Sequence, residues 1–189
     1  TEWIQEKTKS DDVLMLLSAK QLRVALVTTH IPLDKVTKSI TKRKVIAKAT
    51  ILNEDLKLKL KVKAPKLVML GLNPHAGEGG TIGKQENLIL KPAAKYLRKK
   101  GINISDPISA DTAFTQKMLK ETDAYLAMYH DQALPVLKAL SFGEGINVTL
   151  GVPIVRTSVD HGVALDIAGS GKASFSSLQN ALDTAKSMI

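Results

Sequence analysis

The hydrophobic pattern of the first third of the chain predicts two strands followed by two helices. Apolar runs over residues 13–17 and 23–27 favour strands, with a short polar connection between them. After residue 32, apolar positions recur every three or four residues, which predicts one helix over residues 33–40 and another over 45–56. The alternating stretch 58–63 is either a strand or the end of this second helix.

The rest of the chain continues this alternation of strands and helices. An apolar strand over residues 66–72 leads into a glycine-rich loop ending at Gly83, and a helix follows over 85–100, with Pro92 as its awkward residue. Gly101 comes after a basic last turn, as glycine commonly does at a helix end. The remaining predicted elements are strands at 102–104, 124–128 and 147–150, a helix after residue 112, and a helix over 176–188. The alternation predicts an α/β architecture with a largely parallel sheet.

Composition narrows the class of protein. The 189 residues are 44% hydrophobic, enough for a sizeable buried core. No apolar run approaches the roughly 18 residues that span a bilayer, so we expect no membrane segment. The chain has no cysteine, which excludes disulfides, thiolate metal sites and a cysteine nucleophile and fits a cytoplasmic protein. Any metal must be held by histidine and carboxylate.

The net charge of +9 first suggests a polyanionic partner such as nucleic acid. Only four of the 27 basic residues are arginine, however, and aromatic residues make up 4% of the chain, too few for base stacking. Four lysines alternate with apolar residues, which predicts that they form the solvated face of an amphipathic element: Lys57, Lys59, Lys61 and Lys63. We therefore expect surface lysine and no nucleic acid partner.

The four histidines, His30, His75, His130 and His161, each follow a predicted strand. In α/β proteins the carboxyl ends of strands converge on the ligand crevice, so histidines distant in sequence can meet there. Three imidazoles, with water or a substrate oxygen, would hold a cation. Alternatively, each histidine is a loop residue or a hydrogen-bonded core residue, since no short local metal motif is present.

Three cationic or amide side chains stand within apolar sequence: Lys138, Asn147 and Arg156. A charge among buried residues needs a partner, and a bound carboxylate or phosphate would supply one. An internal ion pair with Asp131 or Asp160 is the alternative. The glycine-rich loop after residue 74 could bring backbone amides close to an anion, or it could be an ordinary strand-to-helix turn.

Several uncommon motifs follow one another in order along the chain. They are residues 72–80 (LNPHAGEGG), 109–112 (SADT), 128–132 (MYHDQ), 147–151 (NVTLG) and 156–162 (RTSVDHG). With these motifs the chain resembles the 4-hydroxythreonine-4-phosphate dehydrogenase (PdxA) family over essentially its whole length. The resemblance implies the two-domain α/β/α fold of the isocitrate and isopropylmalate dehydrogenases, here incomplete.

The family is longer than this chain, so we expect the chain to be its C-terminal part, without the N-terminal region. On this reading residues 1–133, approximately, form a central domain for metal binding and dimerisation. Residues 134–189 return into the cofactor-binding domain.

The resemblance also implies an activity in vitamin B6 (pyridoxine 5'-phosphate) biosynthesis. Family members use NAD or NADP and a divalent metal (zinc, magnesium or cobalt) to oxidise 4-phosphooxy-L-threonine. The β-keto acid formed loses CO2 to give 3-amino-2-oxopropyl phosphate. Family members are homodimers with the active site at the subunit interface, which implies that the ligands of one metal need not all come from one chain.

Site residues carry over position by position from the family motifs. The metal ligands fall on His30, His75 and His130. The substrate contacts fall on Thr1, Lys138, Asn147 and Arg156. The cofactor loop falls on His161, Gly162 and Asp166. Two alternatives stay open: a paralogous dehydrogenase of D-threonate or D-erythronate 4-phosphate, and a non-catalytic fragment that dimerises or binds an anion.

Overall fold

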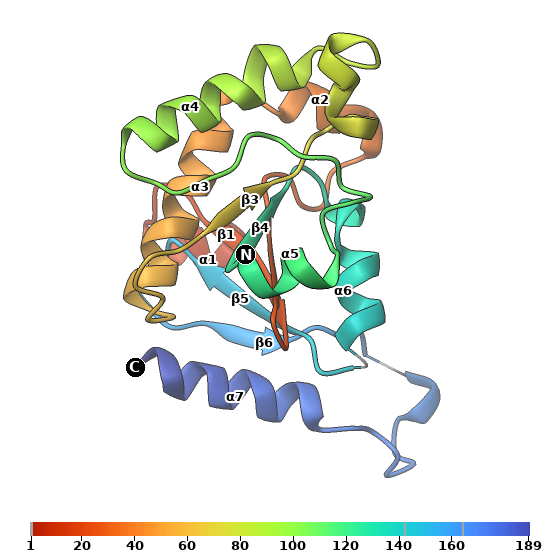
Figure 1. Cartoon of the computed structure of the whole chain (residues 1–189). Coiled ribbons are helices and arrows are strands. Elements are labelled where there is room, and N and C mark those ends of the chain that lie inside the picture. The colour runs from red at the N-terminus through yellow and green to blue at the C-terminus, as the bar shows by residue number, and fades with distance from the viewer. Residues whose placement is uncertain (1, 142, 164) are drawn as a thin grey trace.

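The computed structural model describes residues 2–141, 143–163 and 165–189, and these form one six-stranded sheet covered by helices (Figure 1). The strands are β1 (Leu14–Ala19), β2 (Leu22–Leu26), β3 (Leu67–Met69), β4 (Ala124–Ala127), β5 (Ile146–Leu150) and β6 (Thr157–Val159). Their order across the sheet is β3-β4-β2-β1-β5-β6. The sheet takes strands from both sides of residue 133, and the division into domains there stays a prediction.

The sheet is mixed, so the prediction of a largely parallel sheet is wrong. β2 and β3 both pair with β4 in parallel, whereas the pairs β1–β2, β1–β5 and β5–β6 are antiparallel. For the β1–β2 pair the reason is local: only Lys20 and Gln21 separate the two strands, and Lys20 has a φ of 52°. A connection of two residues can join only antiparallel strands, because a parallel crossover needs a dozen residues or more.

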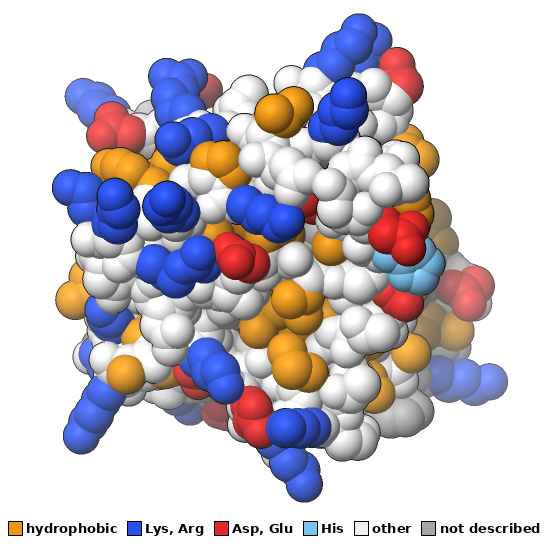
Figure 2. Space-filling view, turned by 45° about the horizontal axis from the view of Figure 1, so that its top comes forward, with side chains coloured by type: hydrophobic (Ala, Val, Ile, Leu, Met, Phe, Trp, Pro, Cys, Tyr) orange, Lys and Arg blue, Asp and Glu red, His pale blue; other side chains and the backbone are white. Residues whose placement is uncertain are grey.

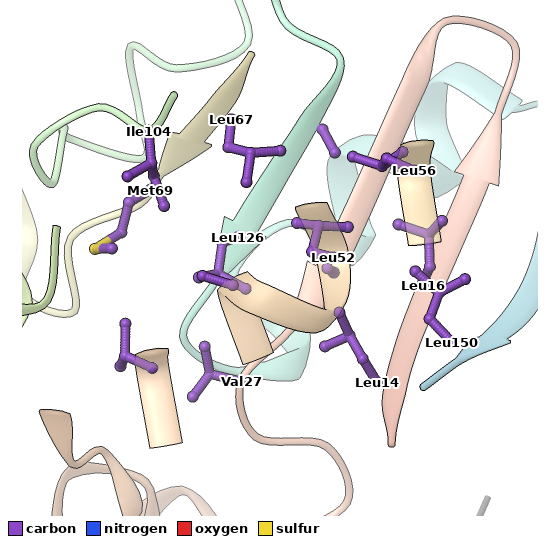
Figure 3. Close-up of a cluster of buried hydrophobic side chains, with 14 of the residues drawn as sticks. Leu14, Leu16, Val27, Leu52, Leu56, Leu67, Met69, Ile104, Leu126 and Leu150 are labelled. Atoms are coloured by element: carbon purple, nitrogen blue, oxygen red, sulfur yellow. The ribbon is translucent and has the colours of Figure 1, made fainter. Parts of the chain in front are cut away.

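Helices cover both faces of the sheet. The helices are α1 (Glu2–Thr8), α2 (Leu33–Ser39), α3 (Lys42–Leu58), α4 (Lys91–Lys99), α5 (Gln116–Glu121), α6 (Leu134–Ser141) and α7 (Ser176–Met188). Buried side chains of α2, α3, α4 and α7 pack in one apolar cluster with β1, β3, β4 and β5. Figure 3 shows part of this cluster, with Leu52 and Leu56 of α3 among the sheet residues. Side chains of α5 and α6 pack in a second cluster on the other face, around Tyr125 of β4.

The helix α3 confirms the second predicted helix and settles the stretch after it. The Thr41 side chain caps its start by accepting from the Lys44 N–H, and Leu52 and Leu56 are fully buried. The helix ends at Leu58, and residues 59–63 form no strand. Lys57, Lys61 and Lys63 are exposed as predicted. The prediction is wrong for Lys59, whose ammonium group lies 2.8 Å from the Asp55 carboxylate in a mostly buried ion pair.

The predicted helix over residues 85–100 has two parts. A π-helical turn, Glu86–Leu90, leads into α4, and Pro92 lies in the first turn of α4, where its missing N–H costs no hydrogen bond. Gly101 follows with a φ of 81°, which confirms the predicted helix end. The strand predicted over 102–104 is only a single bridge from Ile104 to Leu67.

Basic side chains are spread over the molecular surface with acidic ones between them, as Figure 2 shows for one face. On α4 the exposed basic residues are Lys91, Lys95, Arg98 and Lys99. Among the helices formed by the described residues, none is long and apolar enough to cross a bilayer.

Candidate functional site

Three parallel strands end at one edge of the sheet, and each is followed by a histidine. β2 leads to His30, β3 to His75 and β4 to His130. The prediction that these histidines follow strands is confirmed. His161 also follows a strand, β6, but β6 runs antiparallel to β5 and so ends at the opposite edge. The topology therefore separates His161 from the other three.

His30 and His130 lie beside each other. Their ring centroids are 5.5 Å apart, with the rings tilted by 50°. Both line a cavity of about 300 Å³. Its other lining residues are Thr29, Ile31, Leu33, Val36, Tyr129 and Asp131. Two imidazoles at this separation can share one cation between them.

Hydrogen bonds fix the two loops that carry this pair. The Thr28 hydroxyl donates to the Met128 carbonyl at 2.7 Å, which joins the ends of β2 and β4. The Gln132 side chain accepts from the Met128 N–H at 2.7 Å and donates to the Gly71 carbonyl after β3. Gln132 thus ties β4 to β3, a role that its sequence context did not indicate.

The imidazole of His130 has an orienting partner. Its Nδ1 lies 2.6 Å from Oδ1 of Asp131, the next residue in the chain. A carboxylate on Nδ1 fixes the ring and leaves Nε2 available to a ligand, an arrangement common among metal-bound histidines. Asp131 is exposed, so this contact contributes orientation more than stability.

His75 stands apart from the pair. It is exposed in the loop Pro74–Gly80, near Asp111. A hydrogen bond from the Ser109 hydroxyl lowers the pKa of Asp111, and the charge of His75 acts in the same direction. Among the described residues, no group of three or more histidine or carboxylate side chains is arranged to hold a metal. Within one chain, then, His30 and His130 come together and His75 does not join them.

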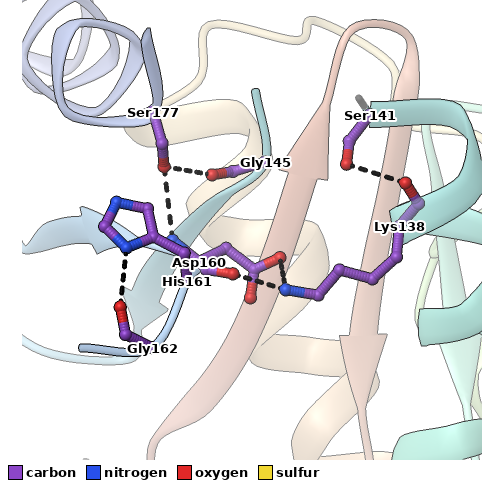
Figure 4. Close-up of polar contacts among 7 residues, drawn as sticks. All are labelled: Lys138, Ser141, Gly145, Asp160, His161, Gly162 and Ser177. Atoms are coloured by element: carbon purple, nitrogen blue, oxygen red, sulfur yellow. Dashed lines mark hydrogen bonds and ion pairs between the residues drawn. The ribbon is translucent and has the colours of Figure 1, made fainter. Parts of the chain in front are cut away.

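Lys138, a predicted substrate contact, is engaged by Asp160. Its ammonium group lies 2.8 Å from Asp160 Oδ2 and also donates to the Asp160 carbonyl (Figure 4). The Asp160 N–H in turn donates to the Ser177 hydroxyl of α7. The internal ion pair, one of the alternatives open from the sequence, is therefore present. Lys138 is half exposed, so an incoming anion can compete with Asp160 for it.

The other predicted substrate contacts lie on β5 and just before β6. Asn147 and Thr149 are two residues apart on β5 and so face the same side of the sheet. Arg156 donates to the Thr149 hydroxyl at 3.2 Å. The Asn147 side-chain oxygen is buried with no hydrogen-bond partner among the described residues. A buried unpaired acceptor is costly, which makes Asn147 a candidate for a ligand contact. Thr1 lies outside the described residues.

The predicted cofactor residues lie near α7. His161 and Gly162 line a cavity of about 490 Å³, and the His161 Nδ1 is 3.0 Å from the Gly162 carbonyl oxygen. Asp166 lies in the short 3-10 turn Leu165–Ile167 and is exposed. It is not among the residues that line this cavity.

Comparison with known proteins identifies the family. The family model described as "Pyridoxal phosphate biosynthetic protein PdxA" matches residues 1–185. The chain belongs to the PdxA family. Two curated relatives named 4-hydroxythreonine-4-phosphate dehydrogenase, from Neisseria meningitidis serogroup A and Enterobacter sp., are 53% and 50% identical to the whole chain. The chain spans 57% and 58% of their lengths.

Solved structures of similar dehydrogenases confirm the fold. A 4-hydroxythreonine-4-phosphate dehydrogenase from Klebsiella pneumoniae matches 99% of the chain with a TM-score of 0.87 and 35% identity, and the match covers 57% of that structure. A terephthalate 1,2-cis-dihydrodiol dehydrogenase from Burkholderia xenovorans matches 98% of the chain, with a TM-score of 0.78 and 28% identity, over 59% of its own length. The chain has the α/β, isocitrate/isopropylmalate dehydrogenase-like fold of these enzymes and covers just over half of it.

Proposed function

We propose that this chain carries the metal- and substrate-binding part of a 4-hydroxythreonine-4-phosphate dehydrogenase. The reaction is the NAD(P)-dependent oxidation of 4-phosphooxy-L-threonine to a β-keto acid, which decarboxylates to 3-amino-2-oxopropyl phosphate in vitamin B6 biosynthesis. The observation that carries the proposal is the His30–His130 pair at the ends of β2 and β4. The chain that holds this pair is 53% identical to a relative named 4-hydroxythreonine-4-phosphate dehydrogenase. The protein would act in the cytoplasm as a homodimer.

The donor set suits a divalent metal such as zinc, magnesium or cobalt. His30 and His130 offer two imidazole nitrogen ligands, and Asp131 orients one of them. We assign the third position to His75 of a second copy, because His75 of the same chain does not join the pair. When bound, the cation supplies Lewis acidity at the substrate hydroxyl, and NAD or NADP supplies the hydride acceptor.

The chain's own polar residues would bind and orient the substrate. Arg156, anchored by Thr149, presents its guanidinium group to a carboxylate or phosphate. Lys138 exchanges Asp160 for the substrate anion, and the unpaired oxygen of Asn147 accepts from a substrate hydroxyl or amine. Residues 1–133 provide the metal-binding and dimerisation domain in this proposal.

The cofactor-binding part of the proposal rests on residues 134–189. His161 and Gly162 line the cavity beside α7, where the adenine side of NAD or NADP would bind, with Asp166 in the adjoining turn. This assignment depends on the family resemblance and on the cavity at that place.

Calorimetric titration of the 189-residue chain tests the proposal without requiring turnover. We expect binding of zinc or cobalt, followed by metal-dependent binding of 4-phosphooxy-L-threonine. His130→Ala should abolish both, whereas His161→Ala, a histidine at the opposite edge, should leave metal binding intact. Unchanged metal binding in His130→Ala would contradict the proposal. Tighter binding of D-threonate 4-phosphate would favour the paralogous activity, and metal binding without substrate binding would favour a non-catalytic fragment.

A further inference from the structure

A buried carboxylate lies behind the His75 loop. Glu86 is 1% exposed and belongs to the π-helical turn that precedes α4. A buried carboxylate must be paired or hydrogen-bonded, because burial strips it of water. No role in metal or substrate binding falls on Glu86 in the proposed function, and π-helical turns occur often at functional sites.

Glu86 binds the chain just before His75. Its Oε1 accepts from the N–H groups of Leu72 and Asn73, each at 2.8 Å. Its Oε2 accepts from the Asn73 side-chain amide at 2.9 Å. The carboxylate thus uses both oxygens on the last two of the four residues that connect β3 to the loop.

The neighbours of Glu86 bind the same loop. Gln85 accepts from the Asn73 side chain at 2.9 Å, and Asn87 donates to the Gly79 carbonyl at 2.8 Å. Three consecutive side chains at the start of the π-helical turn therefore contact Asn73, just before the loop, and Gly79, near its end. The fit is tight, because a Cβ on Gly77 would lie 2.5 Å from Glu86 Oε2.

The loop needs such support because its backbone is strained. All five residues from His75 to Gly79 have left-handed φ angles, between 43° and 75°. Three of them, His75, Ala76 and Glu78, are not glycine and so carry a steric penalty in this conformation. Strained backbone of this kind persists only where its surroundings determine it.

We infer that Glu86 is a positioning residue for the metal ligand His75: its carboxylate holds Leu72 and Asn73 so that the strained loop presents the imidazole in one place. The inference rests on the proposed function, in which His75 is a ligand. Partners that orient metal ligands typically change metal affinity by about 10- to 100-fold when removed.

Glu86→Gln tests the inference with a side chain of nearly the same size and shape. The amide cannot accept on both sides, so its NH2 group faces either the Asn73 amide or the backbone N–H groups. We expect the dissociation constant for zinc or cobalt to rise about 10- to 100-fold and the absorption spectrum of bound cobalt to change. Hydrogen exchange of the Leu72 and Asn73 amides should accelerate in the metal-free chain. Circular dichroism should show an intact fold.

Two variants separate this inference from its alternatives. Glu78→Gln removes the same charge from an exposed position of the same loop and should leave metal affinity unchanged. An equal loss in Glu78→Gln would overturn the inference in favour of a general charge effect. His75→Ala should weaken metal binding at least as much as Glu86→Gln.

The remaining outcomes are equally decisive. If folded Glu86→Gln binds metal with normal affinity while His75→Ala binds it more weakly, the positioning role of Glu86 is overturned. The metal role of His75 then stands. Normal affinity in His75→Ala would overturn the metal role and the inference with it. If Glu86→Gln fails to fold, Asn73→Ala removes one contact to Glu86, and unchanged cobalt affinity and spectrum there would overturn the inference.

Discussion

Asp55→Ala removes a carboxylate that holds the turn between β5 and β6, and we expect a large loss of stability. Asp55 is 8% exposed on α3. Its Oδ2 accepts from the Gly151 N–H at 2.7 Å and pairs with the Lys59 ammonium group at 2.8 Å. Lys59 also donates to the Val152 carbonyl at 2.7 Å, so helix and turn are joined at two points.

The magnitude follows from the groups left behind. The Gly151 N–H, in a part-buried contact, loses its acceptor, and a fully buried donor left unpaired would cost about 1–3 kcal/mol. The Lys59 side chain, 16% exposed, loses its counter-charge. Breaking a fully buried pair costs about 3–5 kcal/mol, but Lys59 keeps the Val152 carbonyl and some water. We therefore expect a net loss of about 2–4 kcal/mol in the free energy of unfolding.

Urea denaturation followed by far-UV circular dichroism measures this loss. Asp34→Ala is the matched control, because Asp34 pairs with Lys35 at 3.2 Å while both side chains are mostly exposed. Its effect should stay below about 0.5 kcal/mol. A loss below about 1 kcal/mol in Asp55→Ala, or an equal loss in the control, would refute the reasoning.

Two further stability predictions concern the core. Leu52→Ala should cost about 2–5 kcal/mol in urea denaturation, because Leu52 is 0% exposed, whereas Leu58→Ala, at 69% exposure, should be near neutral. Burial raises the pKa of Tyr125, whose hydroxyl donates to the Ala113 carbonyl at 3.0 Å. Since the folded pKa exceeds the unfolded value of 10.0, stability present below pH 10.0 should be lost as pH rises through the folded pKa. Urea midpoints across that range check this, and an unchanged pH dependence in Tyr125→Phe would contradict it.

Local elements were predictable because each has its own sequence signal. Leu52 and Leu56 keep helical spacing, and the apolar residues of β4 form a short continuous run. The direction of the strands was not predictable from alternation alone. It depended on the two-residue turn at Lys20 and Gln21, which the sequence marks only as a polar connection.

The candidate site was likewise predictable only in part. That His30 and His130 follow strands was readable from the chain, but their proximity required knowing that β2 and β4 are neighbours. Glu86 gave no signal, because its partners include backbone N–H groups, which carry no side-chain signature. Lys138 was recognised as a charge needing a partner, and only the return of the chain after β6 selected Asp160 rather than Asp131.

The separation of His75 from the His30–His130 pair has a consequence for assembly. Glu86 and its neighbours hold the His75 loop tightly, so the loop cannot swing toward the pair at small cost. The proposed three-histidine site would therefore take His75 from another copy. In a two-fold symmetric dimer this exchange is reciprocal, so each copy contributes His75 to one site and the pair to the other.

Mixing of variants tests this arrangement. A His75→Ala chain retains the His30–His130 pair, and a His130→Ala chain retains His75. In a mixed dimer, the pair of the first chain and His75 of the second form one complete site. The other site lacks both His75 and His130. Random pairing should restore about a quarter of the native metal sites, counted by zinc titration after the two chains are unfolded and refolded together. Mixing His30→Ala with His130→Ala should restore none, because no arrangement of these chains contains an intact pair. Equal absence of metal sites in both mixtures would show that His75 does not act across the dimer.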